Sequence, residues 1–318
     1  MTEHPMVTAR NGLAGPLSPQ HSERLRRWVM TEGIGYAENT CKALISDWRH
    51  FADWCASNRL APGEVSEDRI VEYLVAHQNL AIGTQRRRIN SLSVFFTAIG
   101  REDNPARSGP VAAIMRAQAR QRSSSPGASQ QRPITWSMIV KGRANTNTDD
   151  LMQLRALVMV MLAYDGLLRR SEITCIRVEH IASMSDGALG QDDARILIAR
   201  SKTDQAGEGA YVFCARDTAE LLALWCTRLR LQPREFLFPT QRGGNLVPST
   251  QRPMSDALVT RIFKAFAQIA GDSGHKISGH SCRIGAAQDM VAAGVSIPAA
   301  AIAGGWRSEE MVIRYASG

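Results

Sequence analysis

The chain has 318 residues and a mass of 34.9 kDa, a length that predicts roughly two domains of about 150 residues each. Its apolar content of 44% allows a sizeable buried core, and its charged residues, at 21%, are too few and too mixed for a disordered chain. The net charge is +8 and the pI is near 9.5. This charge favours a polyanionic partner, but by itself it does not distinguish nucleic acid from an acidic membrane surface.

Hydropathy excludes a membrane span and a secretory signal. The longest apolar stretch, from Ala156 to Tyr164, has nine residues, whereas a span needs about 20. The N-terminus has no apolar core of signal-peptide length.

The cysteines have neither CxxC spacing nor a nearby histidine at zinc-finger spacing; they are Cys41, Cys55, Cys175, Cys214, Cys226 and Cys282. We therefore expect reduced, mostly buried thiols in a cytoplasmic protein.

The N-terminal part of the chain predicts a tail followed by a helical domain. Residues 1–20 predict a flexible tail, because prolines and glycines are spread through them. Apolar residues then recur at spacings of three and four, the pattern of amphipathic helices. Helices are predicted over residues 38–58, 66–77, 83–99 and 105–122. Residues 21–122 are therefore predicted to form an all-helical domain.

A polar stretch without periodicity, residues 123–132, predicts an interdomain linker. Residues 133–318 are predicted to form a second domain that is mainly helical. Two strand-like runs, 194–199 and 209–214, are separated by a loop typical of a hairpin. Further helices are predicted over residues 217–231, 255–271, 281–293 and 298–316. The sequence thus predicts a mainly α protein with a small antiparallel β-sheet.

Positive charge is concentrated at the end of the first domain. Between Arg86 and Arg122 the sequence has eight arginines and two acidic residues, which supplies +6 of the total charge of +8. Three consecutive arginines occupy three angular positions of a helix, so at least one must face outward. This pattern favours a surface that faces DNA, and a solvated helix face is the alternative. The residues assigned to DNA binding are Lys42, Gln85, Arg86, Arg87, Arg88 and Asn90.

Two short segments of the second domain could carry chemistry on an anion. In Ser278–Arg283, a helix that starts after Gly279 would place His280 and Arg283 on one face of its first turn. Helix N-terminal amides favour an anion there, so the pair fits a phosphodiester oxygen. The alternative is a structural histidine beside a surface arginine. In the other segment, Arg169 follows the most apolar stretch and Glu172 could hold it, although a local helical ion pair is the alternative.

Further candidates for this chemistry lie in the predicted hairpin loop and near the C-terminus. Lys202 lies at the tip of the predicted strand pair, where an ordinary exposed lysine is the alternative. A Gly-Gly-Trp turn at Trp306 leads into a short helix that carries Tyr315, with Ser308 suited to begin it. Simple packing roles for the tryptophan and the tyrosine are the alternative there.

Taken together and in this order, these residues resemble the catalytic set of the tyrosine recombinase (phage integrase) family, and most closely its Cre subgroup. The segments LAYDGLLRRSEITCIRVEHI and GHSCRIGAAQDMVAAGVSIPAAAIAGGW are similar to the corresponding Cre-type segments. The residues that match the family's motifs are Arg169, Glu172, Lys202, His280, Arg283, Trp306 and Tyr315.

The resemblance implies a role for each residue. Tyr315 would attack a DNA phosphodiester and form a 3′-phosphotyrosine, and Lys202 would protonate the 5′ leaving oxygen. Arg169 and Arg283 would bind the non-bridging oxygens through their paired donors. His280 and Trp306 would donate further hydrogen bonds, and Glu172 would orient Arg169. No acidic cluster resembles a two-metal site, and the phosphotyrosine conserves the bond energy, so we expect no metal, no ATP and no other cofactor.

The resemblance also implies an architecture. A helical core-binding (SAM-like) domain and an α/β catalytic domain would form a C-shaped clamp around DNA. Four protomers would hold two duplexes through a Holliday junction, and a recombinase of bacterial, phage or plasmid origin would act in the cytoplasm without a membrane partner. Relatives of this type carry a further helix after the nucleophile, whereas the 318 residues end three positions after Tyr315.

Three other functions stay open at this point. A type IB topoisomerase or a telomere resolvase would use the same residues. A DNA-binding relative that no longer cuts would have no need of the complete set. A basic helical interaction protein would explain the charge but would leave the ordered set to chance.

Overall fold

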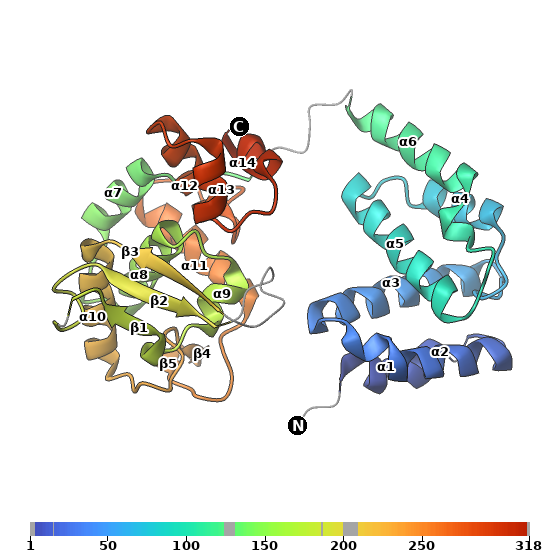
Figure 1. The fold of residues 1–318 in the computed structure, drawn as a ribbon, viewed down its shortest axis with the longest axis horizontal. Helices are drawn as coiled ribbons and strands as arrows, with labels where there is room; N and C mark the ends of the chain where they lie inside the picture. The colour runs from blue at the N-terminus through green and yellow to red at the C-terminus, as the bar shows by residue number, and fades with distance from the viewer. Residues whose placement is uncertain (1–3, 15, 124–130, 186, 200–208, 317–318) are drawn as a thin grey trace. The chain divides into compact units, whose positions relative to one another are not determined.

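The computed structural model describes residues 4–14, 16–123, 131–185, 187–199 and 209–316. The chain divides into two compact units, Met1–Ser129 and Gln130–Gly318 (Figure 1). The described residues are mainly helical, with two small antiparallel sheets in the second unit, which confirms the predicted fold class. No helix in this described part is long and apolar enough to cross a bilayer.

The first unit packs its helices around an aromatic core. Trp48 stacks on Phe95 with ring centroids 3.9 Å apart, and Phe51, Tyr73 and Phe96 are buried in the same cluster. The helices predicted over 38–58, 66–77 and 83–99 are confirmed. The α-helices of the described residues are α1 (Pro5–Ala14), α2 (Pro19–Thr31), α3 (Glu38–Ser57), α4 (Glu67–Ala76), α5 (Ile82–Ala98) and α6 (Gly109–Ser123).

The prediction of a flexible tail over residues 1–20 is wrong for its described part. Met6 and Leu13 of α1 are fully buried in the core of the first unit. Trp48 Nε1 donates a 3.0 Å hydrogen bond to the Leu13 carbonyl. The prolines that suggested a tail instead begin helices: Pro5 opens α1 and Pro19 opens α2, where a missing N–H removes no helical bond.

The predicted linker can be followed only at its ends. Ser123 ends α6, and residues 124–130 lie outside the described part of the chain. After the linker, the Ile134 N–H donates a 2.9 Å hydrogen bond to the Ser281 carbonyl, so the second unit begins by pairing with the start of a distant helix.

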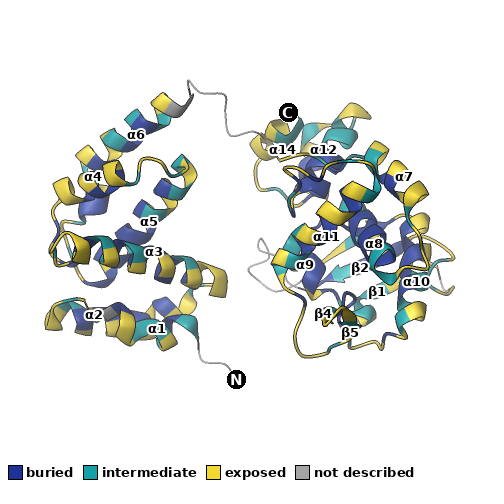
Figure 2. Ribbon diagram, turned by 180° about the vertical axis from the view of Figure 1, so that it is seen from behind, coloured by how far each residue is buried: buried dark blue, intermediate teal, exposed yellow. Residues whose placement is uncertain are grey.

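One helix lies at the centre of the second unit. Residues 154–163 of α8 (Leu151–Asp165) are all buried, as Figure 2 shows. The apolar stretch of the sequence is therefore a core helix, and its all-round burial explains the lack of an amphipathic pattern. The helices that pack on α8 are α7 (Trp136–Asn145), α10 (Arg216–Leu229), α11 (Asp256–Ile269) and α12 (Ser281–Ala292).

The main sheet has the order β1-β2-β3 and is antiparallel. Its strands are β1 (Ile181–Ser183), β2 (Ala194–Ile198) and β3 (Ala210–Cys214), and Ile196 is in register with Ile181 and Val212. The two predicted strands are confirmed as β2 and β3. A separate hairpin joins β4 (Thr240–Arg242) to β5 (Asn245–Val247). Three-residue strands such as these carry too little alternation to be recognised in a sequence.

The C-terminal segment predicted as helical over 298–316 is interrupted. It forms α13 (Ile297–Ala303) and α14 (Glu309–Ala316), and Gly305 adopts a φ of 60° in the turn between them. A left-handed residue cannot continue a helix, which is why the Gly-Gly pair breaks it.

All six cysteines are free, and Cys41, Cys55, Cys214 and Cys282 are buried, which confirms the expectation of mostly buried thiols.

Candidate active site

The turn between α8 and α9 (Arg170–Cys175) introduces the first catalytic candidate. Leu167 has a φ of 45°, an uncommon conformation for a residue with a branched side chain. Its side chain is buried, and its carbonyl accepts a hydrogen bond from Arg283 Nη1. These contacts hold the strained turn in place.

Arg169 and Glu172 form a rigid pair at the start of α9. The Glu172 carboxylate accepts a 2.7 Å hydrogen bond from the Arg169 backbone N–H and another, also 2.7 Å, from Arg169 Nη1. The Glu172 side chain is only 6% exposed. Arg169 Nη2 also donates to the Gly305 carbonyl at 3.0 Å. The pair is therefore more than a local helical ion pair, because it joins α9 to the turn before α14.

Arg283, the second arginine, is 3% exposed on the first turn of α12. Besides its bond to the Leu167 carbonyl, its Nη2 donates to the Gly304 carbonyl at 2.9 Å. Burial lowers the pKa of the Arg283 guanidinium to about 10, and the positive charge of Arg169 acts in the same direction. Glu172 and Tyr315 oppose this shift. The side chain thus stays charged at neutral pH, in surroundings where an anion would be strongly attracted.

His280 directly precedes the same helix. It is the N-cap of α12 and is exposed, and its backbone N–H donates a 3.2 Å hydrogen bond to Ser278 Oγ. A Cβ on Gly279 would lie 1.8 Å from Cδ of Arg170, so only glycine fits between the two. The glycine of the Ser-Gly-His sequence is therefore explained by its packing against Arg170, which lies against this turn.

The C-terminal segment carries Trp306 and Tyr315. The Trp306 ring packs against Arg283, whose guanidinium carbon lies 4.5 Å from the ring centroid. The centroids of the Trp306 and Tyr315 rings are 5.8 Å apart. Gln288 Nε2 of α12 donates a 2.9 Å hydrogen bond to the Tyr315 carbonyl. Val312 is buried among small residues of α13. These contacts hold the half-buried Tyr315 next to Trp306, and therefore near Arg283.

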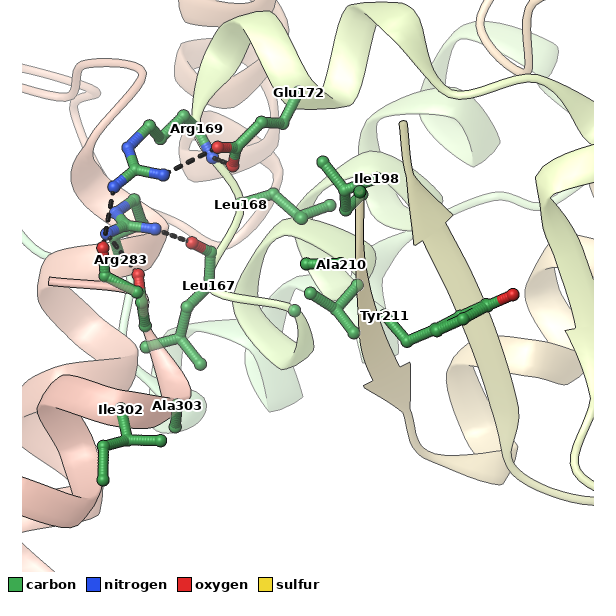
Figure 3. Close-up of a pocket in the computed structure, with 15 residues that line it drawn as sticks. Leu167, Leu168, Arg169, Glu172, Ile198, Ala210, Tyr211, Arg283, Ile302 and Ala303 are labelled. Atoms are coloured by element: carbon green, nitrogen blue, oxygen red, sulfur yellow. Dashed lines mark hydrogen bonds and ion pairs between the residues drawn. The ribbon is translucent and has the colours of Figure 1, made fainter. Parts of the chain in front are cut away.

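A pocket of about 290 Å³ opens beside the two arginines. Figure 3 shows their guanidinium groups next to one another, with the Glu172 carboxylate beside Arg169 and the side chain of Tyr211 extending away from them. The lining residues are Gly166, Leu167, Leu168, Arg169, Glu172, Ile198, Gly209, Ala210, Tyr211, Val212, Arg283, Ile302, Ala303, Gly304 and Gly305. Two fixed guanidinium groups at one opening suit a phosphate, because each offers planar, paired donors.

One catalytic candidate lies outside the described residues. Lys202 belongs to the segment 200–208, whose neighbours Ile198 and Gly209 both line the pocket. Within the described residues no group of His, Cys, Asp and Glu has the arrangement of a metal site. Sequence reasoning missed the carbonyls of Leu167, Gly304 and Gly305, because backbone acceptors leave no side-chain pattern. The Gly-Gly pair was the one available signal.

All the residues assigned to DNA binding except Lys42 lie on α5, where they separate into two groups. Arg86, Arg87 and Asn90 are exposed on its N-terminal half. Gln85 is 1% exposed, and its Nε2 donates to the Leu80 carbonyl at 3.1 Å, so its assignment to a DNA-facing surface is wrong. Its angular position turns it toward the core, opposite the exposed stripe.

Arg88 also turns inward. Its side chain is 14% exposed, and its Nη1 lies 3.1 Å from His50 Nε2 and 3.5 Å from Tyr73 Oη. The assignment of Arg88 to DNA binding is therefore corrected: the guanidinium joins α5 to α3 and α4.

Lys42 is exposed on α3 and pairs with Glu38 at 2.5 Å. The sequence reasoning missed Ser46 and Arg49, which are exposed on the same helix and line the same surface hollow of about 410 Å³ as Lys42. Their spacings of four and three, opposite the apolar stripe of α3, could have revealed them.

Known proteins match most of the chain. The family model described as the phage integrase family matches residues 143–317. The chain is 28% identical over 295 residues to the recombinase Cre of Escherichia phage P1, covering 88% of this chain and 84% of Cre. In structure it is similar to the XerH site-specific recombinase bound to its difH substrate, with a TM-score of 0.64, 12% identity and coverage of 98% and 91%. A lambda integrase tetramer bound to a Holliday junction matches with a TM-score of 0.54, 15% identity and coverage of 93% and 76%.

Proposed function

Because the chain belongs to the phage integrase family and is a site-specific tyrosine recombinase, we propose that it cleaves and rejoins DNA through a 3′-phosphotyrosine at Tyr315. One observation carries the assignment of the site. Arg169 and Arg283 meet at one pocket, and Arg283 stacks on Trp306, whose ring in turn contacts Tyr315. Arg169 is held by Glu172 and by the Gly305 carbonyl, and Arg283 by the adjacent Gly304 carbonyl, so these candidates are joined through one turn.

The two arginines would bind the non-bridging oxygens of the scissile phosphate. Glu172 and the carbonyls of Leu167, Gly304 and Gly305 already fix their orientation, so little reorganisation is needed when charge develops in the transition state. Losing one such donor typically costs about 3 kcal/mol in the barrier. Trp306 and His280 would add donors to the same oxygens.

Tyr315 would be the nucleophile. Its phenolic oxygen forms a bond to phosphorus, and the bond from phosphorus to the 5′ oxygen of the next nucleotide breaks. A free tyrosine has a pKa near 10, so the field of the arginines must help to remove the proton. The 5′ oxygen leaves as a hydroxyl, and its later attack on the phosphotyrosine rejoins a strand. One phosphoester replaces another in each step, so neither step needs ATP.

Lys202 would supply the proton to the leaving 5′ oxygen. What supports this is the position of its neighbours, because Ile198 and Gly209 both line the pocket of the two arginines. A lysine ammonium is a mobile donor on a flexible stem, which suits an acid that must reach a leaving group.

The first unit would bind the duplex. The exposed basic residues of α3 and α5, Lys42, Arg49, Arg86 and Arg87, support a DNA surface there. A homotetramer on two duplexes is supported by the similarity to Cre and by the lambda integrase tetramer bound to a Holliday junction. Such an enzyme would act on specific sites in the cytoplasm of a bacterial cell.

Trapping with a suicide DNA substrate tests this function. The substrate would come from the DNA that flanks the gene and would carry a nick that prevents religation. The wild type should form a covalent adduct, and Tyr315→Phe should form none while binding DNA nearly as well. Tyr211→Phe is the matched control, since Tyr211 lines the same pocket and is 56% exposed.

An adduct that persists in Tyr315→Phe would refute the assignment. Relaxation of plasmids without any crossover product would instead indicate a topoisomerase, and specific binding without any adduct would indicate a relative that no longer cuts.

A further inference from the structure

A buried carboxylate lies directly beneath the exposed face of α5. Asp47 of α3 is 2% exposed. It accepts a hydrogen bond from Arg87 Nη1 and a second one, of 2.7 Å, from Ser91 Oγ. Nε of Arg88 lies 3.9 Å from its other oxygen. An ionised carboxylate survives at such a depth only when it is paired and hydrogen-bonded, so Asp47 depends on these partners.

The Arg87 side chain leads from this carboxylate to solvent. It is 48% exposed, although one of its nitrogens is held by Asp47. Arg86 and Asn90 are exposed beside it, whereas the C-terminal half of α5 is mostly buried. A helix that carries most of its exposed polar side chains on its N-terminal half can present that half to the major groove.

The three consecutive arginines therefore have three different environments. Arg88 points inward to His50 and Tyr73. Arg86 is exposed, and no ion pair of its side chain occurs within the described part of the first unit. Arg87 alone combines exposure with a buried counter-charge.

This counter-charge changes what Arg87 can recognise. The negative charge of Asp47 offsets much of the attraction that Arg87 would have for a phosphate. In return, the ion pair fixes the direction of the planar guanidinium, which removes part of the entropy lost on binding. A directed arginine fork matches the O6 and N7 acceptors of guanine, the commonest specific contact in the major groove. Arg86 has no such constraint and suits a phosphate.

We propose that Arg87 reads a guanine in the major groove of the recombination site and that Asp47 is its positioning residue. The inference rests on the proposed function in one respect, namely that duplex DNA is the substrate. It assigns base recognition to one arginine of the run and backbone contact to its neighbour.

The experiment uses the full chain with Tyr315→Phe, so that binding is measured without cleavage. A preferred site is first selected from randomised duplexes. Affinities are then measured for that site and for duplexes in which each G·C pair is replaced. Arg87→Ala should abolish the preference at one G·C pair, by roughly 5-fold to 150-fold, and should leave the other positions unchanged.

Arg86→Ala is the matched control on the same helix turn. It should weaken binding to all duplexes by a similar factor and should lower the log–log salt slope by about 0.9. Arg87→Lys keeps the charge but loses the fork, so it should lose the guanine preference while the salt slope stays the same.

Asp47→Asn tests the positioning role. It should weaken the preference at the same G·C pair, and binding to unrelated duplexes should not fall, because a negative charge has been removed. If Asp47→Asn unfolds the first unit in a thermal melt, Arg87→Lys still tests the assignment of the guanine to Arg87, because it leaves Asp47 with a cationic partner.

The inference is overturned if Arg87→Ala weakens all duplexes equally, if a folded Asp47→Asn keeps the full preference, or if the selection yields no preferred guanine. These results are independent of catalysis. The adduct assay at Tyr315 reports on the proposed function, and the guanine preference is measured in its absence, so either can fail alone.

Discussion

The guanidinium carbon of Arg283 lies 4.5 Å from the centroid of the Trp306 ring. Arg283 and Trp306 both lie beside the Gly304–Gly305 turn. The Gly304 carbonyl accepts a hydrogen bond from Arg283, and the Gly305 carbonyl accepts one from Arg169. Movement of this turn would displace both arginines and the tryptophan together. The predictions that follow depend on this coupling and on the polar contacts of the first unit.

Gly304→Ala should slow cleavage without weakening DNA binding. A Cβ at this position would lie 2.0 Å from Cζ3 of Trp306, so the indole must leave its place under Arg283. Displacement of about 1 Å in an active site can lower a rate about 100-fold. We expect a loss of this order in single-turnover cleavage, with the Kd for DNA changed less than about 2-fold. Gly35→Ala, whose Cβ meets nothing within 4 Å, should have no effect on the rate.

Arg283→Lys should be nearly as inactive as Arg283→Ala. Two different nitrogens of Arg283 donate to the carbonyls of Leu167 and Gly304, and one ammonium cannot reproduce that fork. We expect the cleavage rate to fall about 100-fold to 1000-fold. Arg170→Lys is the conservative control, because Arg170 packs on Gly279 outside the arginine pair. A lysine at position 283 with wild-type activity would remove Arg283 from the proposed transition-state contacts.

Glu172→Ala should lower both stability and activity. It removes the acceptor of the Arg169 backbone N–H and of Arg169 Nη1, so the start of α9 loses its cap and the guanidinium loses its orientation. The free energy of unfolding should fall by about 1–3 kcal/mol, less than for a fully buried pair because Arg169 is partly exposed. Glu172→Gln keeps one acceptor and should be intermediate in urea unfolding and in cleavage. Equal stability of all three proteins would contradict the capping role.

The stability of the first unit should decrease as the pH falls below neutrality. Burial, together with the charges of Arg88 and His77, lowers the pKa of His50 from its ordinary value of 6.5, while Asp47 and Asp53 oppose the shift. Below pH 6.5 the unfolded chain therefore binds a proton that the native unit does not, and the free energy of unfolding falls until the lower native pKa is reached. His50→Gln should flatten this dependence in urea unfolding at pH 7.5 and 5.5. An unchanged slope would show that His50 does not carry it.

Part of the site was predictable because some of its contacts join residues that are close in the sequence. Arg169 and Glu172 are three residues apart, so one helical turn was enough to predict their contact. In the structure Arg169 Nη1 lies 2.7 Å from Glu172 Oε1. The same reasoning located α3, α4 and α5 from their apolar periodicity. The order of the candidate catalytic residues along the chain was sufficient to suggest the family, which the family model then established.

Contacts between distant parts of the chain were not predictable in this way. The partners of Arg283 and Arg169 at the two turns are backbone carbonyls 116 and 136 residues away. Likewise, Arg87 is distinguished from its neighbours by Asp47, which lies 40 positions earlier on another helix. The buried α1 also differs from the predicted tail, because its Leu13 carbonyl meets Trp48 only in the folded unit.

The sequence by itself therefore predicted which residues would carry the chemistry, and it determined where most of the helices lie and to which family the chain is similar. Periodicity and short spacing encode these features, and both act over a few residues. Only the tertiary structure decided which arginines of the run face solvent, which carbonyls hold Arg169 and Arg283 and how Trp306 is placed against Arg283. These features depend on the packing of helices against one another, and a helix of given sequence can be rotated or buried in more than one way until its neighbours fix it.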